Sequence, residues 1–397
     1  MLSADNPLVA IDVSKGKSHA QGFLSRGHPC GKPFSFAHTK TGFAKLGKLV
    51  SDLLGKAGKP PAVAYEHTGV YSRVVAGWAE SSKLGSIPIP PLLSAKARKA
   101  KLRPTKTDAI DCQTIAEVAY AYDADGRRAA SPLTAISRRR EDAAASAAAA
   151  KARYQQEIDL CWPCLDQFID PTSPSAIAAV AHYRHPSAVL RAGAKRVESV
   201  LGKARRRFGR SSAKAIAESI CSYAGESMSP VAEDSPEIKS LILAAEALKS
   251  SVAAEEELAS ELIAEARESG GFDILMSIDG IGERLAASIL AELGDVARFR
   301  GRESIVAYAG LDPAVSQSGK SAGLHLHITR KGNARLRKYL YLATVGCCSP
   351  AKSNRIKSFV EAKQKGGLPR KAALVAGCRK MIVTIRSMLL NGTLFEH

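Results

Sequence analysis

The sequence predicts a chain with an α/β domain at its N-terminus, a region of long helices in the middle and a mostly α-helical C-terminal domain. Short apolar runs alternate with helically spaced segments over the first 125 residues, the pattern of an α/β sheet domain. The chain then becomes rich in Ala, Arg, Glu and Gln, and a Gly-containing turn separates two apolar segments near residue 280. With 397 residues there is room for two or three domains, and we place their boundaries at 1–125, 126–269 and 270–397.

Two short strands of the first domain each end in a carboxylate. The apolar run LVAIDV (residues 8–13) predicts a buried strand that ends near Asp12, and PAVAYEHTG predicts another that ends at Glu66. The other predicted elements are a returning strand over 19–25, a helix over 43–58 with a terminal glycine, a helix over 70–82, an extended segment over 86–91, and a helix over 107–122 with Thr107 as its N-cap.

The middle region predicts two long helices. Residues 134–160 form one of them, and from residue 236 onward apolar side chains recur at 3-4 spacing, interrupted only at Glu255. This spacing predicts a coiled-coil seam of about four heptads, formed within one chain or between subunits. The seam consists of Ile238, Leu241, Ala245, Leu248, Val252, Ala259, Leu262 and Ala266.

The C-terminal domain begins with a segment that predicts two helices joined by a tight turn. Gly280 and Gly282 lie in this turn, in LMSIDGIGERLAASILAELGD. The arrangement is similar to a helix-hairpin-helix, in which backbone N–H groups hold a phosphate without reading bases. A helical turn without a ligand is the alternative.

The formal net charge of +19 is the exceptional bulk property, because 45% apolar and 24% charged residues describe an ordinary globular protein. Like charges repel in a compact fold, so the excess favours a polyanionic partner, and nucleic acid is the first candidate. An anionic membrane surface and simple solubility are the alternatives. The sequence has no apolar run near the ~20 residues of a membrane span and no signal-peptide pattern, so we expect a cytoplasmic protein.

Eight cysteines are too few for a disulfide scaffold and are expected to be reduced thiols. Cys161 and Cys164 form a CWPC motif, but the sequence offers no second Cys or His pair for a zinc site. We therefore expect these two cysteines to be incidental or to serve packing.

Four carboxylates have the arrangement of a metal site. Asp12 and Glu66 end strands, and ligands bind at strand ends in open α/β sheets. On a helix, Asp108 and Asp111 would have Cβ atoms ~5–6 Å apart, so a nearby cation would offset their repulsion. Such oxygen ligands suit Mg²⁺ or Mn²⁺, and two ions can assist phosphoryl transfer. An N-cap or a surface salt bridge is the alternative for any single carboxylate; the set as a whole favours a metal.

Two basic segments predict contacts with nucleic-acid phosphates. One precedes the paired aspartates and contains Lys96, Arg98, Lys99, Lys101 and Arg103. The other, TRKGNARLRK, contains Arg330, Lys331, Arg335 and Lys338, of which the last two would share a helix face. A solvated helix face is the alternative for the second segment.

Six sequence blocks resemble one protein family. AIDVSK, EHTGVY and KTDAID are similar to the three acidic motifs of the RuvC-like domain of IS110-family transposases. IDGIGERLAASILAELGD, YAGLDPAVSQSG and ITRKGNARLRKYLYLAT are similar, in order and spacing, to the second domain of that family. The blocks cover both ends of the chain and leave roughly residues 125–270 outside the resemblance.

The resemblance implies a ribonuclease H-like N-terminal domain whose carboxylates bind Mg²⁺ or Mn²⁺. Their positions are Asp12, Glu66, Asp108 and Asp111. It also implies a nucleophilic serine, placed by motif at Ser318, that cleaves DNA through a covalent phosphoserine before the strands are rejoined. A structured guide RNA and a homo-oligomer, a dimer or a tetramer in a bacterial or archaeal cytoplasm, are implied as well.

The residues around Ser318 show no Ser-His-Asp arrangement, so a metal or neighbouring cations would have to activate its hydroxyl. Ser316 is the second choice for the nucleophile, and the alternative is that both serines and Ser321 are ordinary loop hydroxyls.

Three other functions stay open at this point. A site-specific DNA invertase of the same architecture would differ in its substrates, and a metal-dependent junction nuclease would not need Ser318. A catalytically inert nucleic-acid-binding protein would keep only the basic surfaces. All four carboxylates and the serine are present, which favours an active enzyme. Whether one subunit supplies both the carboxylates and the serine also stays open.

Overall fold

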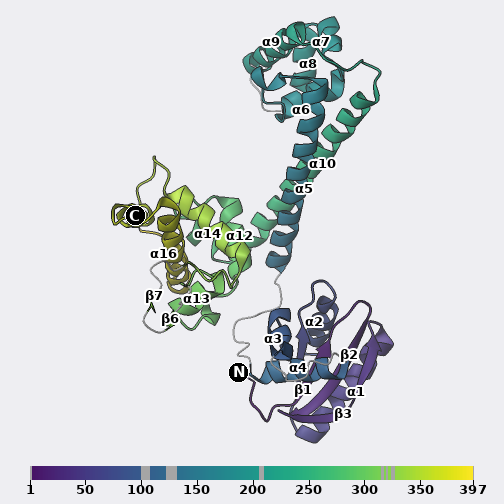
Figure 1. The fold of residues 1–397 in the computed structure, drawn as a ribbon, viewed down its shortest axis with the longest axis vertical. Coiled ribbons are helices and arrows are strands. Elements are labelled where there is room, and N and C mark those ends of the chain that lie inside the picture. The colour runs from purple at the N-terminus through teal and green to yellow at the C-terminus, as the bar shows by residue number, and fades with distance from the viewer. Residues whose placement is uncertain are drawn as a thin grey trace. The chain divides into compact units, whose positions relative to one another are not determined.

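The computed structural model describes residues 2–99, 108–121, 132–204, 210–313, 317–318, 321–322 and 327–396. The chain forms two compact units, which we describe one at a time (Figure 1). Unit 1 comprises residues 1–131 and 297–300, and unit 2 comprises 132–296 and 301–397. The long helices and the C-terminal helices therefore belong to one compact unit.

Unit 1 is a mixed five-stranded sheet with helices on both faces. Its strand order is β3-β2-β1-β4-β5; β1–β2 and β2–β3 are antiparallel, and β1–β4 and β4–β5 are parallel. The elements are β1 (Leu8–Asp12), β2 (Lys17–Ser25), β3 (His28–Ala37), α1 (Lys40–Ala57), β4 (Ala62–Glu66), α2 (Ser72–Ser81), β5 (Ser86–Ile89), α3 (Pro91–Lys99) and α4 (Asp108–Ala121).

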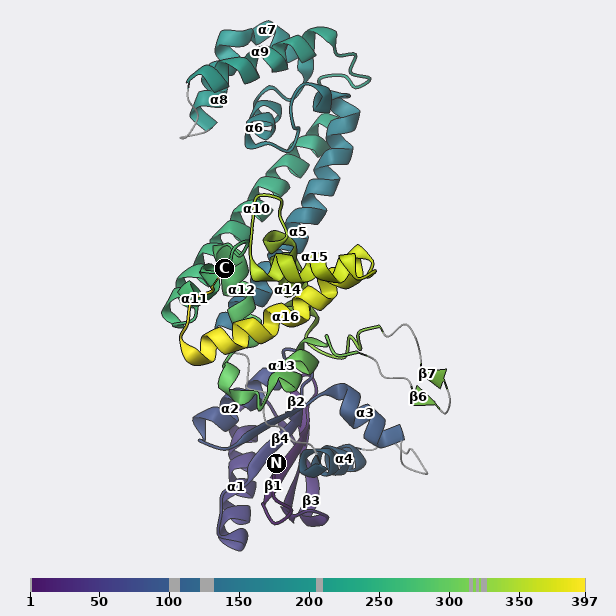
Figure 2. The same ribbon diagram turned by 90° about the vertical axis from the view of Figure 1, so that its left-hand side faces the viewer.

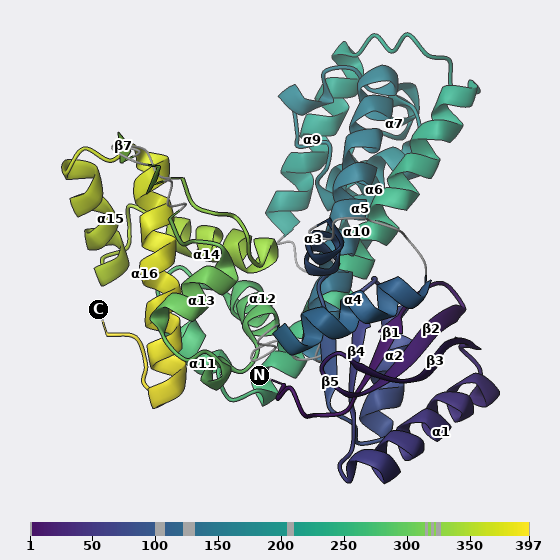
Figure 3. The same ribbon diagram turned by 60° about the horizontal axis from the view of Figure 1, so that its bottom comes forward.

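Alternation along the strands gives each face of this sheet its own apolar core. Leu8 and Ala10 point to the face covered by α4, whereas Val9 and Ile11 point to the face covered by α1 and α2 (Figure 3). The start of α1 requires a glycine, because a Cβ on Gly42 would lie 1.9 Å from the carbonyl oxygen of Ala37. The α/β prediction for this part of the chain is confirmed.

Unit 2 is helical apart from a two-stranded hairpin, within the residues that the structure describes. Its elements are α5 (Pro132–Cys161), η1 (Leu165–Gln167), α6 (Pro174–Tyr183), α7 (Pro186–Ala192), α8 (Ala194–Ala204), α9 (Arg210–Glu226), α10 (Pro236–Glu268), α11 (Phe272–Met276), α12 (Glu283–Leu293), η2 (Val296–Arg298, which crosses into the part assigned to unit 1), α13 (Arg302–Ala309), β6 (Gln317–Ser318), β7 (Ser321–Ala322), α14 (Ala334–Cys347), α15 (Arg355–Lys365) and α16 (Arg370–Asn391).

The two long helices α5 and α10 pair within one chain and run antiparallel (Figures 1 and 2). Arg140 contacts Glu255 near one end of the pair, and Ser240 donates a hydrogen bond to Glu157 near the other. The predicted apolar seam of α10 is buried except at Val252, which is 40% exposed. A coiled-coil supercoil for the pair stays a prediction.

The helices α6 to α9 pack over one end of this pair (Figure 2). Trp162 stacks on Tyr223 at a centroid distance of 5.8 Å, and its indole N–H donates to the carbonyl of Arg184. Cys161 is buried here and Cys164 is exposed; all eight cysteines are free thiols. Burial raises the pKa of Cys161 to about 11, which keeps the thiol protonated and suits a packing role.

The glycines of the predicted helix-hairpin-helix differ in their surroundings. Gly280 has a φ of 90°, and a Cβ there would lie 2.3 Å from the backbone of Gly346, so this glycine lets the turn pack against α14. Gly282, the N-cap of α12, faces open space. Close packing therefore explains Gly280, and phosphate binding at this turn stays a prediction. Across the described helices, none is long and apolar enough to cross a membrane.

Candidate active-site residues

Asp12 and Glu66 lie side by side at the carboxyl ends of two neighbouring strands of the sheet in unit 1. They end the neighbouring parallel strands β1 and β4, whose register pairs Ile11 with Tyr65 directly before them. Ala10 and Ala64, two residues earlier on each strand, point to the face covered by α4. Because side chains alternate along a strand, Asp12 and Glu66 point to that same face.

Asp111 comes to this face on α4. Its neighbour Cys112 packs in the core beneath the helix, and the Cys112 thiol lies 3.4 Å from the carbonyl of His19, the residue paired with Asp12 in the sheet. Asp111 itself is only 5% exposed. The backbone of Asp108 begins α4, but its side chain lies outside the described residues. Three of the four predicted carboxylates are thus placed on one face.

Helix α3 contacts two of these carboxylates through residues one turn apart. Ser94 is buried and donates a hydrogen bond to Glu66 Oε1 at 3.0 Å. Arg98 Nε lies 3.0 Å from Asp111 Oδ1, although neither atom has a hydrogen bond of good geometry. The contact is therefore an electrostatic one.

Of the other four residues in the first basic segment, two are exposed to solvent and two lie outside the described residues. Lys96 and Lys99 are exposed on α3. Lys101 and Arg103 lie outside the described residues. The predicted strip of cations along this segment is therefore placed only in part, and one of its members, Arg98, is directed at a predicted metal ligand.

The oxygen donors on this face suit a divalent cation in their chemistry, although not in their spacing within the described residues. Carboxylate oxygens are the ligands that Mg²⁺ prefers, and the buried Oδ1 of Asp111 lacks a hydrogen-bond partner. In the described part of the chain, no three Asp, Glu, His or Cys side chains group closely enough to hold a metal ion. The four-carboxylate site, which includes Asp108, accordingly stays a prediction.

Ser318 lies on a short antiparallel hairpin in unit 2. In the backbone register it pairs with Ser321 across β6 and β7. Farther down the same hairpin, Pro313 bridges to Ile328, and the Thr329 hydroxyl donates to Asp312 Oδ1 at 2.7 Å. The side chains of Ser318 and Ser321 and the whole of Ser316 lie outside the described residues, so the choice of nucleophile stays a prediction.

The base of this hairpin is closed by two glycines and an asparagine. Gly310 ends α13 with a φ of 65°, and a Cβ on Gly332 would lie 2.4 Å from the Gly310 nitrogen. The Asn333 N–H donates to the carbonyl of Tyr308 at 2.7 Å. The two chain segments that lead to and from Ser318 are therefore held together where they leave the helices.

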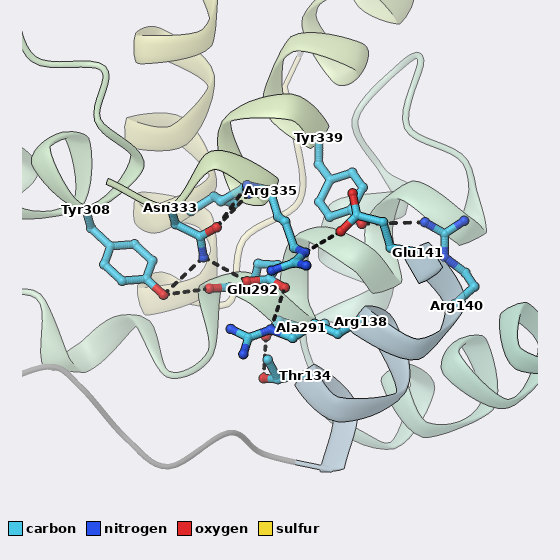
Figure 4. A network of polar contacts seen from close by, with 11 residues as sticks. Thr134, Arg138, Arg140, Glu141, Ala291, Glu292, Tyr308, Asn333, Arg335 and Tyr339 are labelled. Carbon is cyan, nitrogen blue, oxygen red and sulfur yellow. Dashed lines mark hydrogen bonds and ion pairs between the residues drawn. The ribbon is translucent and has the colours of Figure 1, made fainter. Parts of the chain in front are cut away.

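A buried glutamate connects this base to the start of α5 (Figure 4). Glu292 of α12 is 3% exposed, and its Oε2 accepts a hydrogen bond from Asn333 Nδ2 at 2.8 Å. Its backbone carbonyl accepts one from the Tyr308 hydroxyl at 3.0 Å, and Arg138 Nε lies 3.5 Å from its Oε1. Thr134 of α5 donates to the neighbouring Ala291 carbonyl at 2.7 Å.

Two of the predicted phosphate-binding residues contact a carboxylate of unit 2. Arg335 forms an ion pair with Glu141 (Figure 4). Lys338 Nζ lies 3.0 Å from the same carboxylate. Burial would raise the pKa of Glu141, but hydrogen bonds from Lys338 and Arg335 outweigh it and hold that pKa below its ordinary value. Arg330 and Lys331 are exposed.

The sequence analysis did not single out Ser94, Glu292 or Asn333. One signal was present for Ser94, because it lies four residues before Arg98 and so shares a helix face with it. Asn333 directly precedes an apolar helical run, which is an N-cap signal, and its Oδ1 accepts from the Leu336 N–H at 3.1 Å. Glu292 lies in the apolar segment ILAEL and carries no signal of its burial.

Two family models match the chain. Residues 9–163 match a model for the DEDD-type transposase of IS110, and residues 272–361 match the model described as "Transposase IS116/IS110/IS902 family". The first match contains Asp12, Glu66 and both aspartates of α4; the second contains Ser318. The chain belongs to the IS110 family.

Curated relatives agree with this placement. An uncharacterized 43.6 kDa protein of insertion element IS110 from Streptomyces coelicolor is 31% identical over 124 residues, which cover 31% of this chain and 30% of the relative. The pilin gene-inverting protein of Moraxella bovis is 27% identical over 31% of this chain and 38% of its own length. An uncharacterized 44.8 kDa protein of insertion element IS116 from Streptomyces clavuligerus is 25% identical over 73% of this chain and 72% of its own. The alignments with the first two span only about a third of those relatives.

Proposed function

We propose that this IS110-family protein is a DNA transposase, or recombinase, that cuts and rejoins DNA strands. The observation that carries the proposal is the placement of Asp12, Glu66 and Asp111 on one face of a mixed five-stranded sheet, in a chain that also has a serine on a hairpin with a closed base. Family membership supports phosphoryl transfer on DNA as the reaction class.

In the proposed cleavage, Ser318 Oγ attacks a DNA phosphorus, an Oγ–P bond forms and one P–O bond of the strand breaks. The serine proton leaves with the attack, and the released DNA hydroxyl takes up a proton. Rejoining reverses this exchange with a hydroxyl from a different strand end. The protein thereby keeps the energy of the phosphodiester in the phosphoserine between the two steps.

The carboxylates Asp12, Glu66, Asp108 and Asp111 would hold Mg²⁺ or Mn²⁺. When bound, such an ion supplies charge stabilisation for phosphoryl transfer and favours an activated oxygen nucleophile. Ser94 would orient Glu66 through its hydrogen bond, and Arg98 would have to give up part of its contact with Asp111 when a ligand oxygen turns to the cation.

A test of the proposal is mass spectrometry after incubation with Mg²⁺, donor and target DNA, and co-purified RNA. We expect a nucleotide adduct on the peptide that contains Ser318, and we expect Ser318→Ala to remove it. Cleaved DNA without a protein adduct would instead support a metal-dependent junction nuclease. Neither cleavage nor adduct, with DNA binding retained, would support a catalytically inert binding protein.

A guide RNA and a homo-oligomer are part of the proposal. The basic composition supports binding of RNA as well as DNA, since both present phosphates to the +19 net charge. Ribonuclease treatment before the assay should abolish site-specific cleavage while the protein stays folded. Recombination that survives complete removal of RNA would contradict guidance by RNA.

A site-specific DNA invertase is the second candidate. The similarity to the pilin gene-inverting protein of Moraxella bovis favours it, although that match covers only 31% of this chain. The chemistry would be the same, and the substrates would be two sites on one DNA molecule. A plasmid that carries two recombination sites in inverted orientation distinguishes the two, because an invertase flips the enclosed segment and leaves both sites in place.

A further inference from the structure

The helices α15 and α16 and the segment before them carry many basic side chains and very few acidic ones. Residues 349–381 contain nine Lys or Arg and one acidic residue, Glu361. Two of the nine are used within unit 2, since Lys352 Nζ lies 3.1 Å from Asp279 Oδ1 and Lys357 Nζ donates to the Lys352 carbonyl at 2.8 Å. The other seven are exposed. The exposed cations are Arg355, Lys363, Lys365, Arg370, Lys371, Arg379 and Lys380.

A glycine brings the two helices close together. Gly377 of α16 packs against Val360 of α15 and Thr344 of α14, and a Cβ on Gly377 would lie 2.7 Å from Val360 Cγ2. The two helices therefore run beside each other with little space between them (Figure 3). Cations on one helix are brought near cations on the other, although these residues are distant in sequence.

Phe359 of α15 is the centre of this cluster. Lys363 Nζ lies 5.5 Å from the centre of its ring, and Lys380 Nζ of α16 lies 5.0 Å from it. The ring face attracts each ammonium group, but the two groups repel each other. Within the described residues, neither lysine forms an ion pair with a carboxylate. A polyanion at this surface would relieve the repulsion.

A shallow, open surface depression of about 590 Å³ lies beside the ring and is lined by Ser353, Asn354, Arg355, Ser358, Phe359 and Lys380. The Asn354 side-chain oxygen is used by the helix, since it accepts from the N–H groups of Ile356 and Lys357. The serine hydroxyls and the two cations of the lining remain as donors for phosphate oxygens. Arg355 has one weak acidic contact, Nη1 at 3.9 Å from the highly exposed Glu396.

We propose that Lys363 and Lys380, which lie over the ring of Phe359, and Arg355, which lines the adjoining depression, form a docking surface for the phosphate backbone of duplex DNA. The proposal rests on the proposed function, which makes DNA the substrate. Double-stranded DNA is the occupant favoured here because these exposed cations complement a phosphate backbone, and the same unit carries the Ser318 hairpin to which the proposed function assigns DNA cleavage. Charged contacts of this kind fix the position of DNA and read no bases. The surface would therefore hold DNA irrespective of its sequence.

The test uses the full chain with Ser318→Ala, so that binding is measured without cleavage. Fluorescence anisotropy with a labelled duplex of ~30 base pairs gives the dissociation constant over ~50–200 mM NaCl. The test variant carries Arg355→Gln, Lys363→Gln and Lys380→Gln. The control variant carries Arg153→Gln, Lys239→Gln and Lys249→Gln, which remove the same charge from exposed positions elsewhere in unit 2. Circular dichroism confirms that both variants fold.

We expect the test variant to lower the salt dependence, the slope of log affinity against log [NaCl], by ~2–3, because each lost phosphate contact removes ~0.9. The control should change it by much less. Equal weakening in both variants, or no weakening in the test variant, would overturn the proposal. Loss of RNA binding with DNA binding intact would overturn it too and assign the surface to RNA. Binding that is intact in wild type, without any Ser318 adduct, would contradict the proposed chemistry and leave the docking surface standing.

Discussion

Among the residues that the structure describes, each unit buries one helical carboxylate, and the two carboxylates differ in their hydrogen-bond partners. Asp111 of α4 is 5% exposed, and within the described residues its ion-pair partner is Arg98, with no hydrogen bond of good geometry between them. Glu292 of α12 is 3% exposed and accepts a hydrogen bond from Asn333, with Arg138 beside it. The two carboxylates are buried to a similar degree. Glu292 accepts a hydrogen bond of good geometry, whereas Asp111 Oδ1 accepts none within the described residues.

The difference separates a binding role from a structural one. A buried carboxylate oxygen that lacks a hydrogen bond of good geometry costs stability even beside a cation, and a metal ion bound there would offset that cost. Asp111 fits this description at the predicted metal face. Glu292 already has its partners and holds the base of the Ser318 hairpin, so its removal should be felt first as a loss of stability.

Asp111→Asn should give the largest effect on activity. We expect cleavage to fall ~10³-fold, since metal charge stabilisation is worth several kcal/mol in the transition state. Unfolding free energy should change by less than ~1 kcal/mol, because the loss of the ion pair is offset by the lower cost of burying a neutral side chain. Strand-cleavage rates and urea denaturation measure the two quantities. A loss of stability in proportion to the loss of activity would make Asp111 a structural residue.

Glu292→Ala should reverse that pattern. It leaves Asn333 Nδ2 without its acceptor and opens a cavity, so we expect a loss of ~2–4 kcal/mol in unfolding free energy. Glu292→Gln keeps the volume and an acceptor oxygen, and should cost ~1 kcal/mol. Urea denaturation of both variants provides the measurement. Equal stability of wild type and Glu292→Ala would show that the bonding network contributes nothing.

Ser94→Ala tests whether α3 orients Glu66. The hydrogen bond at 3.0 Å goes to a charged acceptor, and such bonds contribute ~1.5–3 kcal/mol, so cleavage should fall ~10–100-fold. The Mg²⁺ concentration for half-maximal rate should rise, and Ser94→Thr should restore part of the activity. A lower rate at an unchanged Mg²⁺ requirement would contradict an orienting role at the metal site.

Glu141→Gln should give the smallest effect. Its partners Arg335 and Lys338 are 42% and 56% exposed, so solvent screening limits the loss to ~1 kcal/mol or less. The pKa of Glu141 is lowered in the folded protein, so its stabilising contribution is present above the unfolded pKa and is lost as the pH falls through the folded pKa. Urea midpoints of wild type and variant should therefore converge in acid. A difference between the two urea midpoints that grows as the pH falls would contradict a lowered pKa of Glu141 in the folded protein.

The residues that end apolar strands could be predicted from the sequence, and those that depend on packing between distant segments could not. Asp12 and Glu66 each follow an uninterrupted apolar run, so their place at a strand end follows from local pattern. The strand β3, by contrast, has the sequence HPCGKPFSFA, whose prolines and polar residues give no strand pattern. Its pairing with β2 also contains register shifts.

Ion pairing between segments distant in sequence was the main failure of prediction. Glu255 interrupts the apolar seam of α10 in the sequence, yet in the structure it forms ion pairs with Arg140 and Arg284. Arg335 and Lys338 looked like free cations on a helix face, and both bind Glu141, which lies almost 200 positions earlier in the chain. Ion pairs between segments this far apart leave no periodic signal in the sequence.

Manganese binding tests the contrast between Asp111 and Glu292 most directly, because it requires no DNA and no turnover. Electron paramagnetic resonance would follow free Mn²⁺ during titration of the wild-type chain, Asp111→Asn and Glu292→Gln. We expect the wild type and Glu292→Gln to bind Mn²⁺ alike and Asp111→Asn to bind at least tenfold more weakly, about 1.4 kcal/mol. Equal binding by Asp111→Asn and the wild type would contradict the assignment of the buried, poorly satisfied carboxylate to the metal site.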